Sequence, residues 1–203
     1  MENNFYSMVL RMKHVDRWGL MRNTWKESLS EHSLDVAVLA HALAVLRKKR
    51  FGKEADPHRA AVLALFHDAS EIITGDLPTP VKYYNDEITS AYKKIEETAS
   101  HSLLSFLPQD LQPDYEPLLI PQKEDQELWV LVKAADKLSA LIKCLEEEKA
   151  GNLEFSVAKE AQLRALHQME LPEVELFLSE FLSGFTKTLD EQSSTVVEKN
   201  GQN

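Results

Sequence analysis

The stretch of sequence that decides the fold is RAAVLALFHDASEII, residues 59–73. Asp56 and Pro57 precede it, and they place an N-cap residue and a first-turn proline at the start of a helix. We therefore predict a buried helix that runs to about Gly75. The adjacent pair His67-Asp68 ends the very apolar run AAVLALF, where burying unpaired polar groups costs free energy.

Two arrangements would compensate a buried His67-Asp68 pair. A divalent cation does so directly, and an imidazole nitrogen combined with a carboxylate oxygen suits Mn, Fe(II), Co or Mg. A pair capped by backbone groups and salt bridges explains the doublet equally well. His32 is a second polar residue that meets a strongly apolar helix, and Asp136 lies in LVKAADKLSALIKCLEE, residues 131–147. An ion pair with a lysine would also explain Asp136, so the spacing H, HD, D carries more weight than any one residue.

The rest of the chain is also predicted to be helical. Only 6 Gly and 8 Pro occur in 203 residues, and no segment alternates polar and apolar residues over a strand length. Ser28 and Glu31 form a capping-box pattern that opens a helix with His32 in its first turn. The predicted helices are 3–13, 29–50, 86–107, 125–149, 153–169 and 173–189. The expected fold is an all-α, single-domain helical bundle over residues 1–190, followed by a disordered tail at 191–203.

Three segments are expected to lie outside these helices. Residues 15–29 read as a polar loop, and GDLPTP, residues 75–80, reads as a turn followed by an extended segment because its prolines cannot continue a helix. Residues 108–124 contain four prolines and read as a surface connection.

Composition limits the classes of function. The chain has 23 Lys and Arg against 33 Asp and Glu, a net charge of −10, which opposes extended binding of nucleic acid or of an anionic membrane. Cys144 is the only cysteine, so an intramolecular disulfide, a four-cysteine zinc site and a CxxC pair are excluded. The N-terminus lacks signal-peptide features, and the apolar run 34–46 is short for a membrane span. We expect a soluble, cytoplasmic protein with no membrane partner and no nucleic acid polymer as partner.

Three segments together resemble a known pattern. EHSLDVA (31–37), LFHDASE (65–71) and KAADKLSALIKCLEE (133–147) look like the H…HD…D motif of the HD-domain phosphohydrolase superfamily. RWGLMRN (17–23) and HDASEIITGDLPTPVKYYN (67–85) resemble its bacterial 5′-deoxynucleotidase branch, and the similarity extends over about residues 9–189. HD alone is an unspecific motif, whereas HDASE followed by TGDLPTPVKY is specific. The resemblance implies a helical bundle of the HD-domain type.

The resemblance also implies a metal site. His32, His67, Asp68 and Asp136 would hold one divalent metal ion, such as Co²⁺, Mn²⁺ or a similar transition metal, with Mg²⁺ also compatible. Two positions of an octahedral ion would remain for water and a phosphate oxygen. His41 lies about 180° around its helix from His32 and faces away. The remaining histidines are interpreted as ordinary surface residues, which favours a single-metal site: His14, His58, His101 and His167.

Catalytic and substrate-binding residues follow from helix geometry and from the resemblance. Glu71 comes four residues after His67 and would share its helical face, as a general acid or base or as a hydrogen-bond partner of a histidine ligand. By resemblance Arg17 orients the phosphate, and Trp18 packs against the sugar and excludes a 2′-hydroxyl, although it would equally serve as a buried anchor for its loop. Further residues placed at the substrate are His32, Asp68, Asp76, Leu77, Pro78, Thr79 and Asp136.

The leading hypothesis is hydrolysis of deoxyribonucleoside 5′-monophosphates to deoxynucleoside and phosphate. The alternatives are another HD-type activity on nucleoside triphosphates or cyclic dinucleotides, a nucleotide-binding regulatory module without catalysis, and a helical scaffold that binds no metal. A homodimer is expected from the resemblance alone. The sequence specifies neither the base preference nor the physiological metal.

Overall fold

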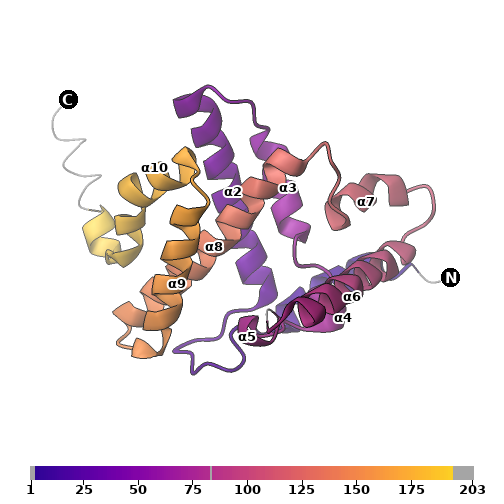
Figure 1. Cartoon of the computed structure of the whole chain (residues 1–203), viewed down its shortest axis with the longest axis horizontal. Coiled ribbons are helices and arrows are strands. Elements are labelled where there is room, and N and C mark those ends of the chain that lie inside the picture. Colours follow the sequence, from indigo (N-terminus) through magenta and orange to yellow (C-terminus); the bar gives the residue numbers. More distant parts are fainter. Residues whose placement is uncertain (1–2, 83, 194–203) are drawn as a thin grey trace.

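The structure is a computed structural model that describes residues 3–82 and 84–193, without the side chain of Thr79. Every regular element in these ranges is helical, as predicted, and the one β-bridge described is the isolated pair Asp16 and Ser28 (Figure 1). The α-helices are α1 (Phe5–Val9), α2 (Leu29–Phe51), α3 (Pro57–Phe66), α4 (Glu71–Thr74), α5 (Thr79–Lys82), α6 (Asp86–Ser105), α7 (Gln112–Leu119), α8 (Gln126–Lys149), α9 (Ser156–Gln168) and α10 (Pro172–Glu180). The 3₁₀ helices are η1 (Leu10–His14), η2 (Leu153–Phe155) and η3 (Leu182–Thr186).

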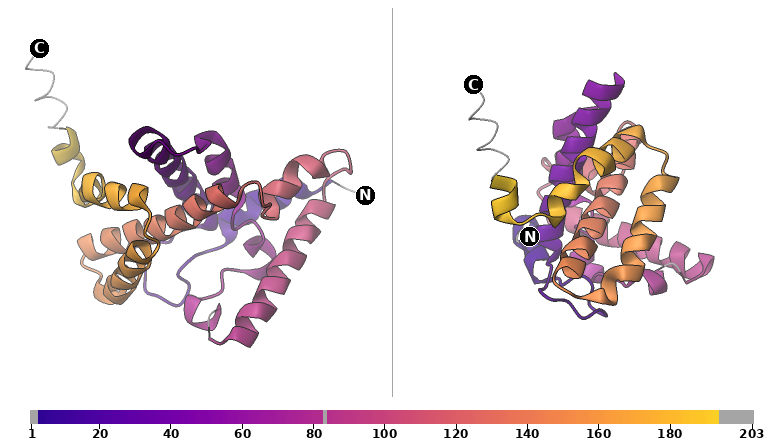
Figure 2. Two further views of the ribbon diagram at one scale, coloured as in Figure 1. Left: turned by 45° about the horizontal axis from the view of Figure 1, so that its top comes forward. Right: turned by 90° about the vertical axis from the view of Figure 1, so that its left-hand side faces the viewer.

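The core of the molecule lies where α2, α3 and α8 pack together. Helices α9 and α10 cover one side of this core, and α4 to α7 lie on the other (Figure 2). Fully buried aliphatic side chains fill the contact between the three central helices. They include Val36, Ala40, Leu43, Ala60, Leu63, Ala64, Leu131 and Leu138.

Helix α2 begins and ends where the sequence predicts. The Ser28 side chain accepts a hydrogen bond from the Glu31 backbone N–H at 3.3 Å, and the Glu31 carboxylate accepts one from the Ser28 backbone N–H at 2.7 Å. Gly52, with φ of 63°, ends the helix in a left-handed conformation that suits glycine. This reciprocal cap fixes His32 in the first turn, with its imidazole facing the core.

By length and composition alone, α2 is apolar enough to cross a membrane, with a mean hydropathy of 1.3. Half of the window with that hydropathy is buried inside the fold, and α2 packs against α3, α8 and α10. These contacts are those of a core helix in a globular protein.

The prediction that the second helix continues to Gly75 is wrong. Helix α3 ends at Phe66, residues 67–70 form turns, and α4 starts at Glu71. The His67 side chain explains the break, because its Nδ1 lies 2.7 Å from the Ala64 carbonyl oxygen. In a continuous helix that carbonyl would accept from the backbone N–H of residue 68. His67 takes this acceptor, and the chain turns.

The proline-containing segments hold more helix than expected. After Gly75, α5 begins at Thr79 with Pro80 in its first turn, so the extended part of GDLPTP is shorter than predicted. Helix α7 lies within 108–124 and buries Leu118 and Leu119. Pro113 occupies its first turn, where a backbone N–H has no intrahelical partner and its loss costs little. The expected tail falls mostly at 194–203, outside the described residues, and 189–193 are helical.

Candidate metal centre and active site

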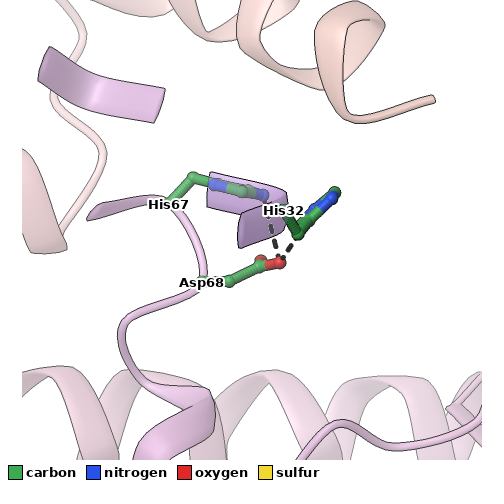
Figure 3. Close-up of side chains that lie close together, drawn as sticks. All are labelled: His32, His67 and Asp68. Atoms are coloured by element: carbon green, nitrogen blue, oxygen red, sulfur yellow. Dashed lines mark ion pairs between the residues drawn. The ribbon is translucent and has the colours of Figure 1, made fainter. Parts of the chain in front are cut away.

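The four predicted ligands come from three helices and meet at one place. His32 is in the first turn of α2, His67 and Asp68 follow the end of α3, and Asp136 is in α8. His32 Nε2 lies 3.1 Å from Asp136 Oδ1 and 3.6 Å from Asp68 Oδ2, and His67 Nε2 lies 3.0 Å from Asp68 Oδ2. Figure 3 shows the Asp68 carboxylate directed at both histidines. Ligand atoms of His32, His67 and Asp68 all lie within 4.8 Å of one another, and Asp136 joins them through His32.

The two imidazole rings are oriented as metal ligands. A carbonyl oxygen only accepts, so His67 Nδ1, 2.7 Å from Ala64 O, carries a proton, and Nε2 is the nitrogen available to a metal ion. His32 Nδ1 lies 3.1 Å from the hydroxyl of buried Ser139, which can accept its proton and leave Nε2 to face the cluster. Both Nε2 atoms are buried, and neither makes a hydrogen bond of good geometry with the described residues. Buried nitrogens rarely lack a partner, and this donor set fits a divalent metal ion.

The charges at the cluster are arranged for a cation. Burial by itself would lower the pKa of His67, but the neighbouring Asp68 carboxylate outweighs it and raises that pKa to about 9. Burial would raise the pKa of Asp136, but its close contact with His32 and the nearby positive charges lower it. Without a metal ion, the positive charge of His67 therefore offsets part of the negative charge of Asp68 and Asp136.

Glu71 lies beside the ligands, although not on a continuous helix with them. Its backbone N–H bonds to Asp68 O at 2.9 Å across the turn, and its side chain is buried. Burial, together with the charges of Asp68 and Asp76, raises the pKa of Glu71 to about 9, against the opposite effects of Lys82 and Arg17. Such a carboxyl group holds a proton at neutral pH and can donate it to a reacting oxygen.

Arg17 and Trp18 lie in the loop before α2. Arg17 Nη1 bonds to the Glu27 carboxylate at 2.9 Å. Although burial disfavours its charge, the carboxylates of Glu27, Asp136, Asp68 and Asp76 raise the pKa of Arg17, so the charges of two predicted metal ligands act on the guanidinium. The Trp18 ring packs edge-on against Phe155, with centroids 5.3 Å apart. The loop therefore presents both predicted substrate-binding residues together.

The remaining predicted substrate residues lie between α4 and α5. Asp76, Leu77 and Pro78 are half-buried there, and the charge of Asp76 acts on both Arg17 and Glu71. The side chain of Thr79 lies outside the described residues, so its predicted role stays a prediction. His41 faces away from the cluster toward His58, with ring centroids 5.7 Å apart. The other histidines are exposed, as predicted: His14, His58, His101 and His167.

Sequence reasoning missed three residues around the site. Ser139 holds the His32 ring, Glu27 holds Arg17, and Lys82 places its ammonium 3.9 Å from the Glu71 carboxylate. Ser139 follows Asp136 by three residues on α8, and this spacing was the one available signal. Nothing in the polar loop or in α5 distinguishes Glu27 or Lys82 before the tertiary contacts are known.

A helical bundle that joins a histidine, a His-Asp pair and an aspartate at one metal centre defines the HD-domain phosphohydrolase class. The fold is similar to an HD-domain phosphohydrolase from Listeria innocua, with a TM-score of 0.79 at 24% identity over 97% of this chain and 98% of that one. It is also similar to the HD phosphohydrolase of cyanophage S-2L, solved with dA and one catalytic Zn²⁺, with a TM-score of 0.64 at 20% identity over 88% and 96%.

Sequence comparison identifies the family within this class. The profile of the YfbR-like 5′-deoxynucleotidases matches residues 4–185. A curated 5′-deoxynucleotidase of Vibrio parahaemolyticus is 50% identical over 95% of this chain and 99% of its own. One from Erwinia tasmaniensis is 46% identical over 94% of this chain and 96% of its own. The chain belongs to the YfbR-like 5′-deoxynucleotidase family.

Proposed function

We propose that this protein hydrolyses deoxyribonucleoside 5′-monophosphates to deoxynucleoside and phosphate with one divalent metal ion, held by His32, His67, Asp68 and Asp136. The observation that carries the proposal is the pair of buried Nε2 atoms that face two carboxylates without a hydrogen bond. The names of the curated relatives and the dA and Zn²⁺ bound to the cyanophage protein support it. The mixed nitrogen and oxygen donors suit Co²⁺, Mn²⁺ or a similar transition metal, and they also accept Mg²⁺.

When bound, the cation supplies Lewis acidity toward the phosphorus centre and lowers the pKa of a coordinated water. Arg17 orients the phosphate through its guanidinium, whose bond to Glu27 uses only Nη1 and leaves other N–H groups to donate. This local positive charge is needed because the protein carries a net charge of −10 and the carboxylates of Asp68, Asp76 and Asp136 lie near the site. The Arg17 guanidinium thereby attracts the phosphate of the substrate to the site, although the net negative charge of the protein repels it elsewhere.

Glu71 moves the proton in this scheme. As the water oxygen attacks phosphorus in line with the leaving group, the protonated Glu71 donates its proton to the 5′ oxygen as the P–O bond breaks, and the resulting carboxylate takes a proton from the attacking water. The electron pair of that bond stays on the 5′ oxygen, and no covalent intermediate forms. A pKa raised to about 9 supports this role, because a group that tends to hold its proton can donate it to the leaving oxygen.

Trp18 selects the sugar in this proposal. Its ring packs against the deoxyribose and leaves no room for a 2′-hydroxyl. The half-buried segment of Asp76, Leu77 and Pro78 forms the opposite wall, together with Thr79. The base stays outside these contacts, so the proposal carries no base preference.

We also propose a cytoplasmic homodimer that binds no nucleic acid polymer. Exposed apolar side chains support the dimer, because Leu34 and Val38 on α2 are 59% and 62% exposed and lie one turn apart. Val62 and Leu65 on the adjoining α3 are also exposed. Two copies of α2 packed antiparallel would pair acidic Asp35 near the start of the helix with basic residues at its end, which are Lys48, Lys49 and Arg50. The buried free thiol of Cys144 suits a reducing compartment.

The experiment that tests the function is phosphate release by chelator-stripped protein supplied with dAMP, AMP or dATP and with Mn²⁺, Co²⁺ or Mg²⁺ restored. We expect release from dAMP in preference to AMP and dATP, none without metal, and a loss of about 10²- to 10⁴-fold in Glu71→Gln. Glu160→Gln, an exposed glutamate on α9, is the matched control and should behave as wild type. Release from none of the three under any metal would overturn the proposal.

A further inference from the structure

Glu27 joins the two residues to which the proposed function assigns phosphate and sugar recognition. Its Oε2 accepts a hydrogen bond from Arg17 Nη1 at 2.9 Å and another from Trp18 Nε1 at 2.8 Å. The Glu27 side chain is only 9% exposed. One buried carboxylate oxygen therefore fixes the guanidinium and the indole relative to each other.

The backbone reinforces this arrangement. The Arg17 N–H donates to the Glu27 carbonyl at 2.9 Å, and Asp16 pairs with Ser28, so the two ends of the loop run side by side. Trp18 has φ of 59°, a conformation that costs a bulky residue free energy and persists only where surrounding contacts enforce it. The bond from the indole N–H to Glu27 is such a contact, because it turns the Trp18 ring back toward the start of α2.

We infer that Glu27 is a positioning residue that sets the relative placement of Arg17 and Trp18, so that phosphate orientation and discrimination against a 2′-hydroxyl depend on the same carboxylate. This inference rests on the proposed function. Glu27 acts through its two neighbours and does not contact the reacting atoms. Without it, the indole has no buried acceptor to hold it in place, and the wall that excludes the 2′-hydroxyl loosens.

Kinetics of Glu27→Gln and Trp18→Phe test the inference. Glu27→Gln removes the charge of the carboxylate and keeps the size of the side chain. Trp18→Phe removes the indole N–H donor together with one of the two fused rings. Both should lower the ratio of kcat/KM for dAMP to that for AMP by about tenfold, as expected for loss of a charge-assisted hydrogen bond. The double variant should lose little more than either single variant, because both interrupt one contact. Glu146→Gln, a neighbouring glutamate on α8 that lines the same surface hollow as Glu27, should leave the ratio unchanged.

Hydrogen exchange of the Trp18 indole N–H gives a second readout that needs no turnover. We expect slow exchange in the wild type and in Glu146→Gln, and exchange at least about tenfold faster in Glu27→Gln, since the open state becomes more populated as the bond weakens. Unchanged selectivity in a folded Glu27→Gln variant, or unchanged exchange, would overturn the inference. If the wild type releases no phosphate from dAMP, the proposed function fails, and the exchange rates alone decide the role of Glu27.

Discussion

At the scale of single residues, buried charges attach the loop before α2, which carries Arg17 and Trp18, to the rest of the protein. The Glu147 carboxylate on α8 is fully buried and accepts hydrogen bonds from Lys143 Nζ at 2.5 Å, from the Thr24 backbone N–H at 2.9 Å and from Asn152 Nδ2 at 2.8 Å. Lys143 in turn donates to the backbone carbonyl of Trp25 at 3.0 Å. The loop that carries Arg17 and Trp18 is thereby tied to α8.

This anchor makes stability depend on pH in a defined direction. Burial alone would raise the pKa of Glu147, but the hydrogen bonds from Lys143, Thr24 and Asn152 lower it from 4.5 to about 2. A carboxyl group with a depressed folded-state pKa contributes stability above about pH 4.5, and that contribution is lost as the pH falls toward about 2. Glu147→Gln should therefore lower the free energy of unfolding by about 1–3 kcal/mol at pH 7, and by less at pH 3.

Urea unfolding of both proteins at several pH values between 7 and 3 measures this difference. Glu160→Gln serves as the control, because the Glu160 side chain is 68% exposed in its pair with Arg164. A gap between wild type and Glu147→Gln that stays constant across this pH range would show that the carboxylate charge is not what stabilises the loop.

At the scale of helices, α2 and α10 are joined by a buried ion pair and by an exposed one. Arg47 Nε and Nη2 bond to Glu173 Oε1 at 2.7 and 2.5 Å, with both side chains at most 5% exposed. Arg50 and Glu180 connect the same two helices at 3.7 Å on the surface. Arg47 Nη1 also donates to the Glu127 carbonyl at 3.4 Å and to its exposed carboxylate at 3.3 Å, so the buried pair is part of a larger network.

Removing one partner of the buried pair should cost far more than removing one partner of the exposed pair. We expect Arg47→Met to lower the free energy of unfolding by about 3–5 kcal/mol, because Glu173 is left as an uncompensated buried charge. Arg50→Met should cost less than about 1 kcal/mol. The double variant Arg47→Met/Glu173→Leu should recover most of the loss, since apolar packing replaces both charges. Equal costs for the two single variants in denaturant titrations would contradict this assignment.

The limits of prediction from sequence are also clearest at the scale of helices. The start of α2 was predictable because the Ser28 and Glu31 cap depends on neighbours within one turn. The end of α3 was not, because a side chain of the helix itself, His67, takes the carbonyl that would have continued it. Helix α7 was missed because Pro117 lies inside it, where proline normally disfavours a helix, and because the helix is stabilised by burying Leu118 and Leu119 against distant segments.

The same distinction applies to the site. His32, His67, Asp68 and Asp136 were predictable because their types and spacing form a motif, and the structure brings them together. Glu27 and Ser139 act through contacts across 10 and 107 positions of the chain. No local pattern marks such residues, so only the folded arrangement identifies them.

At the scale of the whole molecule, the exposed apolar face of α2 and α3 predicts self-association. Val38→Glu should convert the proposed dimer to a monomer, because it places a charge among the exposed apolar side chains of the proposed interface. Light scattering coupled to size-exclusion chromatography measures the mass directly. Val157→Glu on α9 is the matched control, since Val157 is 77% exposed and lies on another helix. A wild-type monomer, or a Val38→Glu protein that remains a dimer, would refute the interface.

The predicted metal ligands come from three separate parts of the chain, and this affects both when the metal can bind and how stable the protein is without it. Because His32, His67 and Asp136 are far apart in the chain, they form a set only after α2, α3 and α8 have docked. The cation would therefore bind the finished fold and act as a reversible cross-link between segments that are otherwise held by packing and a few polar contacts, such as Arg47 with Glu127. A cell that runs short of the metal loses activity first, and it then holds a less stable pool of this protein that proteases clear sooner.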